Sequence, residues 1–266
     1  METARIANAV VFGVLGAASL VLWSRRRDAA TAWLAASLSC LGLGTLVGLA
    51  LPQNSPERLV GWQLWLGKVG VLLPLVLYPY CLLRFAASFD RQRVLSRVAA
   101  AVTALVTVAM LAFPYLPAAR ERPWWVSWWL VLYLVQSVGL SIVAALLLLR
   151  GGRREPAVTK RRMQLLSLSA TALSAAILLS LLTQTAESEL VRTVSTVLVL
   201  GAGGAGLLGL VPPAWLRLLW RRHEHREIYD LQLALISAGS REAVACSVEH
   251  VDNAGAGVRN PDFLAA

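Results

Sequence analysis

Seven long apolar runs dominate this sequence and limit what the chain can fold into. Each is about 18–25 residues long, enough for a helix to cross the roughly 30 Å of hydrocarbon in a bilayer. The runs cover residues 6–23, 29–51, 62–85, 98–116, 125–149, 163–183 and 191–210. Only 15% of the 266 residues are charged and 57% are hydrophobic, more apolar surface than a soluble domain can bury. We predict an all-α fold, a polytopic membrane bundle of seven transmembrane helices.

The sequence divides into a transmembrane domain and two short parts that follow it. Residues 1–211 form the predicted transmembrane domain, which ends at Pro212 and Pro213. Residues 212–238 contain a basic, amphipathic stretch that predicts a juxtamembrane linker helix. Residues 239–266 predict a short cytoplasmic tail with one further helix and a glycine-containing end.

Lysine and arginine lie mostly on one side of the predicted membrane. The rich side holds Arg25, Arg26, Arg27, Arg84, Arg91, Arg93, Arg97, Arg150, Arg153, Arg154, Lys160, Arg161, Arg162 and the arginines of the tail. The poor side holds Arg5, Arg58, Arg120, Arg122 and Arg192. The positive-inside rule makes the rich side cytoplasmic, so we expect a multi-pass plasma-membrane protein with its N-terminus outside and its C-terminus inside. The net charge of +10 follows this topology, and we expect no nucleic-acid partner.

Tryptophans lie near the ends of the apolar runs, as expected for side chains at a membrane–water interface. The outer group comprises Trp62, Trp65, Trp124, Trp125, Trp128 and Trp129, and the inner group Trp23, Trp215 and Trp220.

The stretch "VSTVLVLGAGGAGLLG" contains the spacing of a dinucleotide-binding turn, with Gly201, Gly203 and Gly206 in register. That turn requires a strand before it and a second parallel strand after it. The apolar run is too long for a strand, and two prolines and a basic stretch follow it. We therefore expect no nucleotide cofactor here.

Helix packing explains these glycines better. Small residues every four positions let helices approach closely within lipid. We expect this role for Gly44 and Gly48 in the second run and for Gly201, Ala205 and Gly209 in the seventh.

No catalytic constellation is visible in the sequence. The three histidines all lie after the last apolar run: His223, His225 and His250. His223 and His225 are two residues apart, so on a helix they point in different directions and cannot share a metal ion. His223 followed by Glu224 is conceivable as a phospho-acceptor, but a solvated basic segment beside anionic headgroups explains it more simply. We expect no catalytic residue, no metal and no cofactor.

Lys68 is the one ionisable residue well inside an apolar run. It could extend to the outer headgroups, or it could serve as a counter-charge for an anionic ligand or a polar partner in the bundle. Pro74 and Pro79 follow in the same run and should kink it. Tyr133 and Ser195 lie at a comparable or shallower depth. Lys68, Tyr133 and Ser195 are the candidate ligand-sensing residues of a small polar pocket.

The linker carries a short apolar face of Ile228, Leu231 and Leu235. This face covers fewer than two heptads, so it could pair only weakly by itself. We expect it to associate with a second copy, giving a homodimer, or with a helix of a separate output protein.

Seven spans followed by "PPAWLRLLWRR" and "SREAVACSVEHV", with "RFAASFDR" and "KRRMQLLSLSA" between spans, resemble a known group. They are similar to the N-terminal sensory region of actinobacterial membrane sensor proteins. In that group the region precedes a GAF or PAS domain and a histidine-kinase or diguanylate-cyclase output domain. The resemblance implies that residues 239–266 are the start of a truncated GAF-like domain. It implies either a stand-alone sensory module or a truncated relative whose output domain is lost or encoded elsewhere, with a separate kinase or cyclase as a possible partner. No catalytic residue of the group can be carried over.

The sequence therefore favours a non-enzymatic sensory and signal-transduction module embedded in the lipid bilayer. The alternative is a small transporter or permease, although no internal repeat is visible. A structural membrane protein without a ligand is a third possibility.

Overall fold

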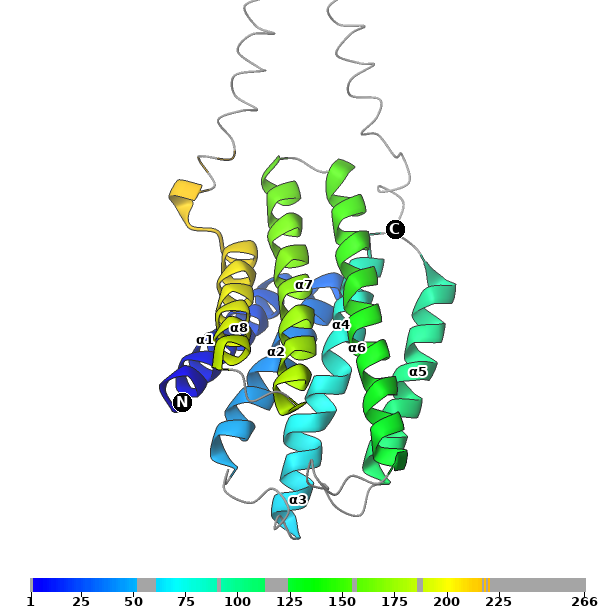
Figure 1. Ribbon diagram of the computed structural model, residues 1–266. Coiled ribbons are helices and arrows are strands. Elements are labelled where there is room, and N and C mark those ends of the chain that lie inside the picture. Colours follow the sequence, from blue (N-terminus) through cyan, green and yellow to red (C-terminus); the bar gives the residue numbers. More distant parts are fainter. Residues whose placement is uncertain are drawn as a thin grey trace, which may run out of the picture.

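The structure, a computed structural model, describes residues 2–51, 61–89, 92–112, 124–154, 157–185 and 189–216, together with residues 218 and 220. Within these residues the chain is helical and contains no strand (Figure 1). The helices are α1 (Glu2–Arg26), α2 (Ala29–Ala50), α3 (Trp62–Gly67), η2 (Lys68–Leu72), α4 (Leu73–Ala87), α5 (Arg93–Leu111), α6 (Trp124–Gly151), η3 (Gly152–Arg154), α7 (Ala157–Thr185) and α8 (Glu189–Leu210). Seven helical segments are long and apolar enough to cross a membrane, which confirms the all-α polytopic bundle.

Several helices begin earlier than the apolar runs suggest, and α5 and α7 do so by about a turn or more. α5 starts at Arg93 rather than at residue 98, and α7 starts at Ala157 rather than at residue 163. In both cases the added turns carry arginine or lysine. A helix can continue past the hydrocarbon into the headgroup region, where charged side chains are solvated. Hydropathy alone does not detect that extension.

The third span is not a uniform helix. α3 passes into η2, a five-residue π-helical turn, before α4 resumes the α-helical pattern. Pro74 has no N–H and cannot bond the carbonyl four residues before it. The backbone is wider just ahead of this proline, where the Leu73 N–H bonds the Lys68 carbonyl five residues back. π-helical turns of this kind are rare and frequently occur at functional sites.

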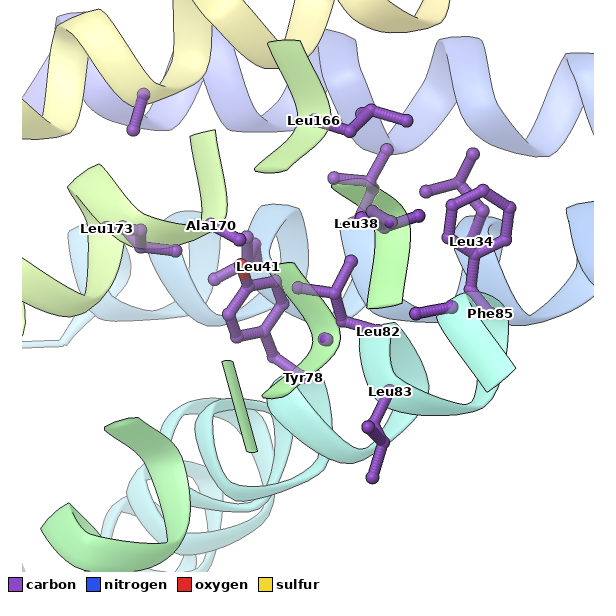
Figure 2. Packing of buried hydrophobic residues seen from close by; sticks show 14 of the residues in the cluster. Leu34, Leu38, Leu41, Tyr78, Leu82, Leu83, Phe85, Leu166, Ala170 and Leu173 are labelled. Atoms are coloured by element: carbon purple, nitrogen blue, oxygen red, sulfur yellow. The ribbon is translucent and has the colours of Figure 1, made fainter. Parts of the chain in front are cut away.

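The helices pack in a layered bundle (Figure 1). α2, α4, α6 and α7 form its centre, α5 packs on α4 and α6 at one edge, and α8 packs on α7 and α1 at the other. Figure 2 shows the core where three helices meet. It contains Leu34, Leu38 and Leu41 of α2, Tyr78, Leu82, Leu83 and Phe85 of α4, and Leu166, Ala170 and Leu173 of α7. Their spacing of three or four residues keeps each set on one helix face.

Large apolar side chains also cover the outside of the bundle. Val108 is 66% exposed, and Leu105, Val135 and Val197 are similarly open. A soluble protein would carry polar residues at such positions, whereas lipid tails solvate them well. Exposed apolar surface around a packed core supports an integral membrane protein.

Glycines allow the closest helix approaches, but not all at the expected positions. A Cβ on Gly42 would lie 2.7 Å from the Phe12 carbonyl oxygen, which brings α2 against the α1 backbone. On α8, a Cβ on Gly203 would lie 2.5 Å from a methyl of Val11, and one on Gly206 would lie 3.2 Å from Ser169 Oγ.

The expectation for Gly201 is wrong, because the residue is exposed and a Cβ there would meet nothing within 4 Å. Gly209 does pack closely, with a Cβ at 3.1 Å from Leu166, and Ala205 is half-buried. Gly44 and Gly48 lie beside Val71 and Pro74 at ordinary van der Waals distances, so a methyl would fit at both. The α8 packing face is rotated toward Ala202, Gly203, Gly206 and Gly209, a register that spacing alone cannot fix.

Candidate functional site: a buried polar layer between α4, α5 and α6

Lys68 begins the π-helical turn and is directed into the bundle. Its side chain is only 4% exposed. Nζ donates a hydrogen bond to the Leu111 carbonyl oxygen at 3.4 Å and lies 5.8 Å from the centre of the Trp65 ring. Leu111 is the last residue of α5, so its carbonyl belongs to the helix end that carries partial negative charge. Of the two interpretations of Lys68, this geometry favours a polar partner within the bundle over extension to the headgroups.

A compact aromatic cluster lies next to Leu111. It consists of Val76, Val106, Met110, Trp129 and Tyr133. Trp129 Nε1 donates to the Val106 carbonyl oxygen at 3.1 Å, and its ring stacks on Tyr133 with centroids 5.6 Å apart. Leu72, one turn after Lys68, packs against the same cluster. The third span, α5 and α6 therefore meet around Lys68 and Tyr133.

Further polar side chains continue from Tyr133 into the bundle. Gln136 Nε2 donates to the Val76 carbonyl oxygen at 3.3 Å and to Thr103 Oγ1 at 3.1 Å. Thr103, Gln136 and Ser137 are all more than nine-tenths buried. We call Thr103, Tyr133, Gln136 and Ser137 the polar layer.

Three oxygens of the polar layer have no hydrogen-bond partner among the described residues. They are Tyr133 Oη, Gln136 Oε1 and Ser137 Oγ. An unpaired buried polar atom costs about 1–3 kcal/mol, so such atoms are few in native structures. The Tyr133 and Ser137 hydroxyls could donate to or accept from a small polar ligand, and Gln136 Oε1 could accept from it. Lys68 bonds α5 eight residues beyond Thr103, about 12 Å along the helix.

Ser195 does not join this site. Its Oγ donates to the Ala176 carbonyl oxygen at 3.4 Å, between α7 and α8. Among the described helices α8 contacts only α7 and α1, so Ser195 is separated from the polar layer. The prediction that Ser195 shares a pocket with Lys68 and Tyr133 is therefore wrong, because depth in the membrane does not tell which helices are neighbours.

The C-terminal end of α8 is fixed by Arg162 of α7. Arg162 Nε donates to the Gly209 carbonyl oxygen at 2.9 Å, and Nη2 donates to that of Leu210 at 3.0 Å. These carbonyls lack intrahelical donors, and a cation at a helix C-terminus is favourable. Arg162 thus fixes α8 just before Pro212. The linker residues proposed to pair, Ile228, Leu231 and Leu235, lie outside the described residues.

Sequence reasoning missed Gln136, Trp129 and Arg162. Gln136 could have been found as an amide inside an apolar run, which needs a partner in lipid. Trp129 is assigned to the interfacial tryptophans by sequence, whereas the structure buries it. Arg162 is one of several loop-side arginines, and nothing in the sequence distinguishes it from Arg161.

The glycine run of the seventh span is continuous helix in α8, without the strand that a dinucleotide-binding turn requires. Among the described residues no group of histidine, cysteine, aspartate or glutamate is arranged to hold a metal ion. Comparison of the chain with protein-family models, curated proteins and solved structures finds no match.

Proposed function

We propose that this protein is a membrane sensory module. Its N-terminus is outside and its C-terminus is in the cytoplasm, the polar layer with Lys68 detects a ligand, and α8 passes the change to the tail. The observation that carries the proposal is the buried Lys68 ammonium at a π-helical turn, bonded to the end of a different helix. Intramembrane charges of this kind commonly belong to ligand or ion sites.

The π turn η2 is proposed as the switching element, with two arrangements: the π-helical turn and a regular α-helical turn. An anionic ligand would compete with the Leu111 carbonyl for Lys68, because a full negative charge is the stronger acceptor. Loss of the extra residue of the π turn would rotate the preceding helix by about 100°. Such a rotation would carry Trp65 and Lys68 around the axis of the span.

Close packing supports transmission beyond the site. A Cβ on Gly70, within η2, would lie 2.6 Å from a methyl of Val47, so α2 cannot stay in place if η2 shifts. α2 packs on α1, α1 packs on α8, and Arg162 fixes the end of α8. A displacement at η2 therefore has a packed route to the residues that precede the tail.

The output is proposed to pass through the apolar face of Ile228, Leu231 and Leu235. It would pair with a second copy or with a separate kinase or cyclase protein, as the resemblance to membrane sensors implies. Single cysteines placed along residues 228–236 test this by cross-linking in native membranes, with Cys40, Cys81 and Cys246 replaced by alanine. Pairing gives a cross-linking pattern that repeats every three or four residues and is abolished by Leu231→Glu with Leu235→Glu. A uniform profile that the double substitution leaves unchanged would contradict it.

Orientation is tested separately. In the same cysteine-free background, a cysteine at position 55 or 188 should react with an impermeant thiol reagent from outside intact cells. A reporter fused to the C-terminus should be active in the cytoplasm. Labelling of position 188 only after the cells are opened would reverse the proposed topology.

A transporter is the second candidate, and the broken third span favours it. Transporters often build substrate sites from discontinuous helices near the middle of the membrane. Alternating access would expose the polar layer to both sides in turn, whereas a sensor requires access from one side at most. A Ser137→Cys variant separates the two: labelling from both sides supports transport, and protection from the cytoplasmic side supports sensing.

A further inference from the structure

An open cavity lies at the other end of the bundle from Lys68, where α2, α4 and α5 meet. Its volume is about 430 Å³, and its lining includes Ala29 and Trp33 of α2, Arg84 and Ala87 of α4, and Gln92 and Ser96 at the start of α5. We call it the inner cavity. Cavities of this size accommodate small molecules or one part of a larger amphiphile.

Arg84 supplies the charge of the inner cavity. Its guanidinium lies over the Trp33 ring, with Cζ 4.8 Å from the ring centre, and Nη1 donates to Ser96 Oγ. These two contacts hold the guanidinium plane in one orientation. A guanidinium has five N–H donors, so the bond to Ser96 leaves donors for an oxyanion.

Two helix starts add to the positive potential. α2 begins at Ala29, and α5 begins directly after Gln92, so residues at both N-terminal ends line the cavity. The nearby carboxylate of Asp28 is engaged by its own helix, where it accepts bonds from the Thr31 N–H and hydroxyl. Because it is bonded within the N-cap, the Asp28 carboxylate faces the first turn of α2.

The rest of the lining is suited to an amphiphile. Trp33, Ala29 and Ala87 give an apolar wall, while Gln92 and Ser96 add polar groups beside Arg84. A phosphate ester could bond the guanidinium and these polar groups, and an attached apolar group could lie along the wall. Basic pockets between helices at the cytoplasmic side of a membrane provide this combination for anionic headgroups.

We infer that the inner cavity binds an anionic phosphate ester through Arg84, supplied either by a phospholipid headgroup or by a soluble phosphate compound. The assignment of the cavity to the cytoplasmic leaflet rests on the proposed orientation. The binding itself does not, because purified protein in detergent exposes both ends.

Native mass spectrometry of the full chain in detergent tests this inference. The probes are phosphatidylglycerol, which is anionic, and phosphatidylcholine, which carries no net charge, with glycerol 3-phosphate as a soluble competitor. Arg84→Gln should weaken phosphatidylglycerol binding roughly tenfold, the loss expected for a charge-assisted hydrogen bond. Arg97→Gln is the matched control, because Arg97 directly follows Ser96 in the sequence, is exposed and does not line the cavity.

A second variant covers the case in which Arg84→Gln fails to fold. Ala87→Phe keeps every charge and fills the cavity, so it should also abolish the preference for phosphatidylglycerol. Displacement by glycerol 3-phosphate would identify a soluble ligand, and its failure to compete would identify the lipid. Equal weakening by Arg84→Gln and Arg97→Gln, or equal binding of both lipids by the unmodified protein, would overturn the inference. The thiol-labelling experiment decides orientation independently of either result.

Discussion

Lys68 donates a hydrogen bond to the carbonyl oxygen of Leu111, 43 residues further along the chain, at an N···O distance of 3.4 Å. The bond joins the π-helical turn of the third span to the last residue of α5. A buried ammonium is thereby stabilised by the negative end of a helix. This arrangement makes Lys68 the centre of the proposed sensory site.

Replacing Lys68 with methionine should leave membrane insertion intact. Removal of a charge from a span favours insertion by roughly 2–3 kcal/mol. The folded bundle should lose about 1–2 kcal/mol of stability, because the Leu111 carbonyl loses its donor. Insertion is measured by thiol accessibility of the loops, and stability by thermal unfolding in detergent. Lys160→Met, the same change at an exposed position on α7, should alter neither, and failure of Lys68→Met to insert would contradict the proposed role.

Gly42→Ala should be among the most damaging single-methyl additions in the bundle. The new Cβ would lie 2.7 Å from the Phe12 carbonyl oxygen, a backbone atom that moves only with α1. The cost should be about 1–3 kcal/mol, as for other overpacked cores. Gly201→Ala adds the same methyl in open space and should stabilise α8 by up to about 1 kcal/mol through helix propensity. Thermal unfolding of the two variants should move in opposite directions, and equal destabilisation would argue against the α1–α2 contact.

Arg162→Gln should loosen the C-terminal end of α8. It removes two charge-assisted bonds to the Gly209 and Leu210 carbonyl oxygens, at a cost of about 2 kcal/mol. Arg161→Gln is the control, because Arg161 is exposed and bonds Gln164 of its own helix. Hydrogen exchange of residues 205–211 should accelerate in Arg162→Gln alone. Unchanged protection there would show that the guanidinium does not fix the helix end.

Asp28 should give α2 a pH-dependent cap. The hydrogen bond from the Thr31 side chain lowers the pKa of Asp28 below its ordinary 3.8. A carboxyl with a depressed folded pKa stabilises the protein above the unfolded value, and that contribution is lost as pH falls through the folded pKa. Asp28→Asn keeps the cap and should remove this part of the acid sensitivity, while Asp28→Ala should cost about 1 kcal/mol at neutral pH. Thermal unfolding from about pH 7 to about pH 2 measures both effects, and identical acid sensitivity in Asp28→Asn would exclude the carboxylate as its source.

The fold was accessible from sequence because lipid imposes few solutions. A run such as residues 29–51 must form all its backbone hydrogen bonds within one helix, so hydropathy predicts both the helical structure and the number of spans. The break at Lys68–Leu72 was only partly accessible. Pro74 predicts a disturbed helix, but the choice of a π turn depends on how η2 packs against Val47 and α5.

The site was predicted less well, since it depends on which helices are neighbours. Lys68 and Tyr133 share a region because α5 joins the third span to α6, whereas Ser195 lies on the far side of α7. Gly201 and Gly209 are eight residues apart and lie about 80° apart around α8, yet one is open and the other is packed. Contacts between helices, rather than the pattern along one helix, decided each of these outcomes.

Coupling between Lys68 and the tail is tested most directly by comparing cross-linking profiles in native membranes. Single cysteines at positions 228–236 are cross-linked in the cysteine-free background, in Lys68→Met and in Lys160→Met. Sensing through Lys68 predicts a profile that repeats every three or four residues and shifts its maxima in Lys68→Met, with Lys160→Met matching the parent. A profile identical in all three proteins would contradict the proposal that Lys68 controls the tail.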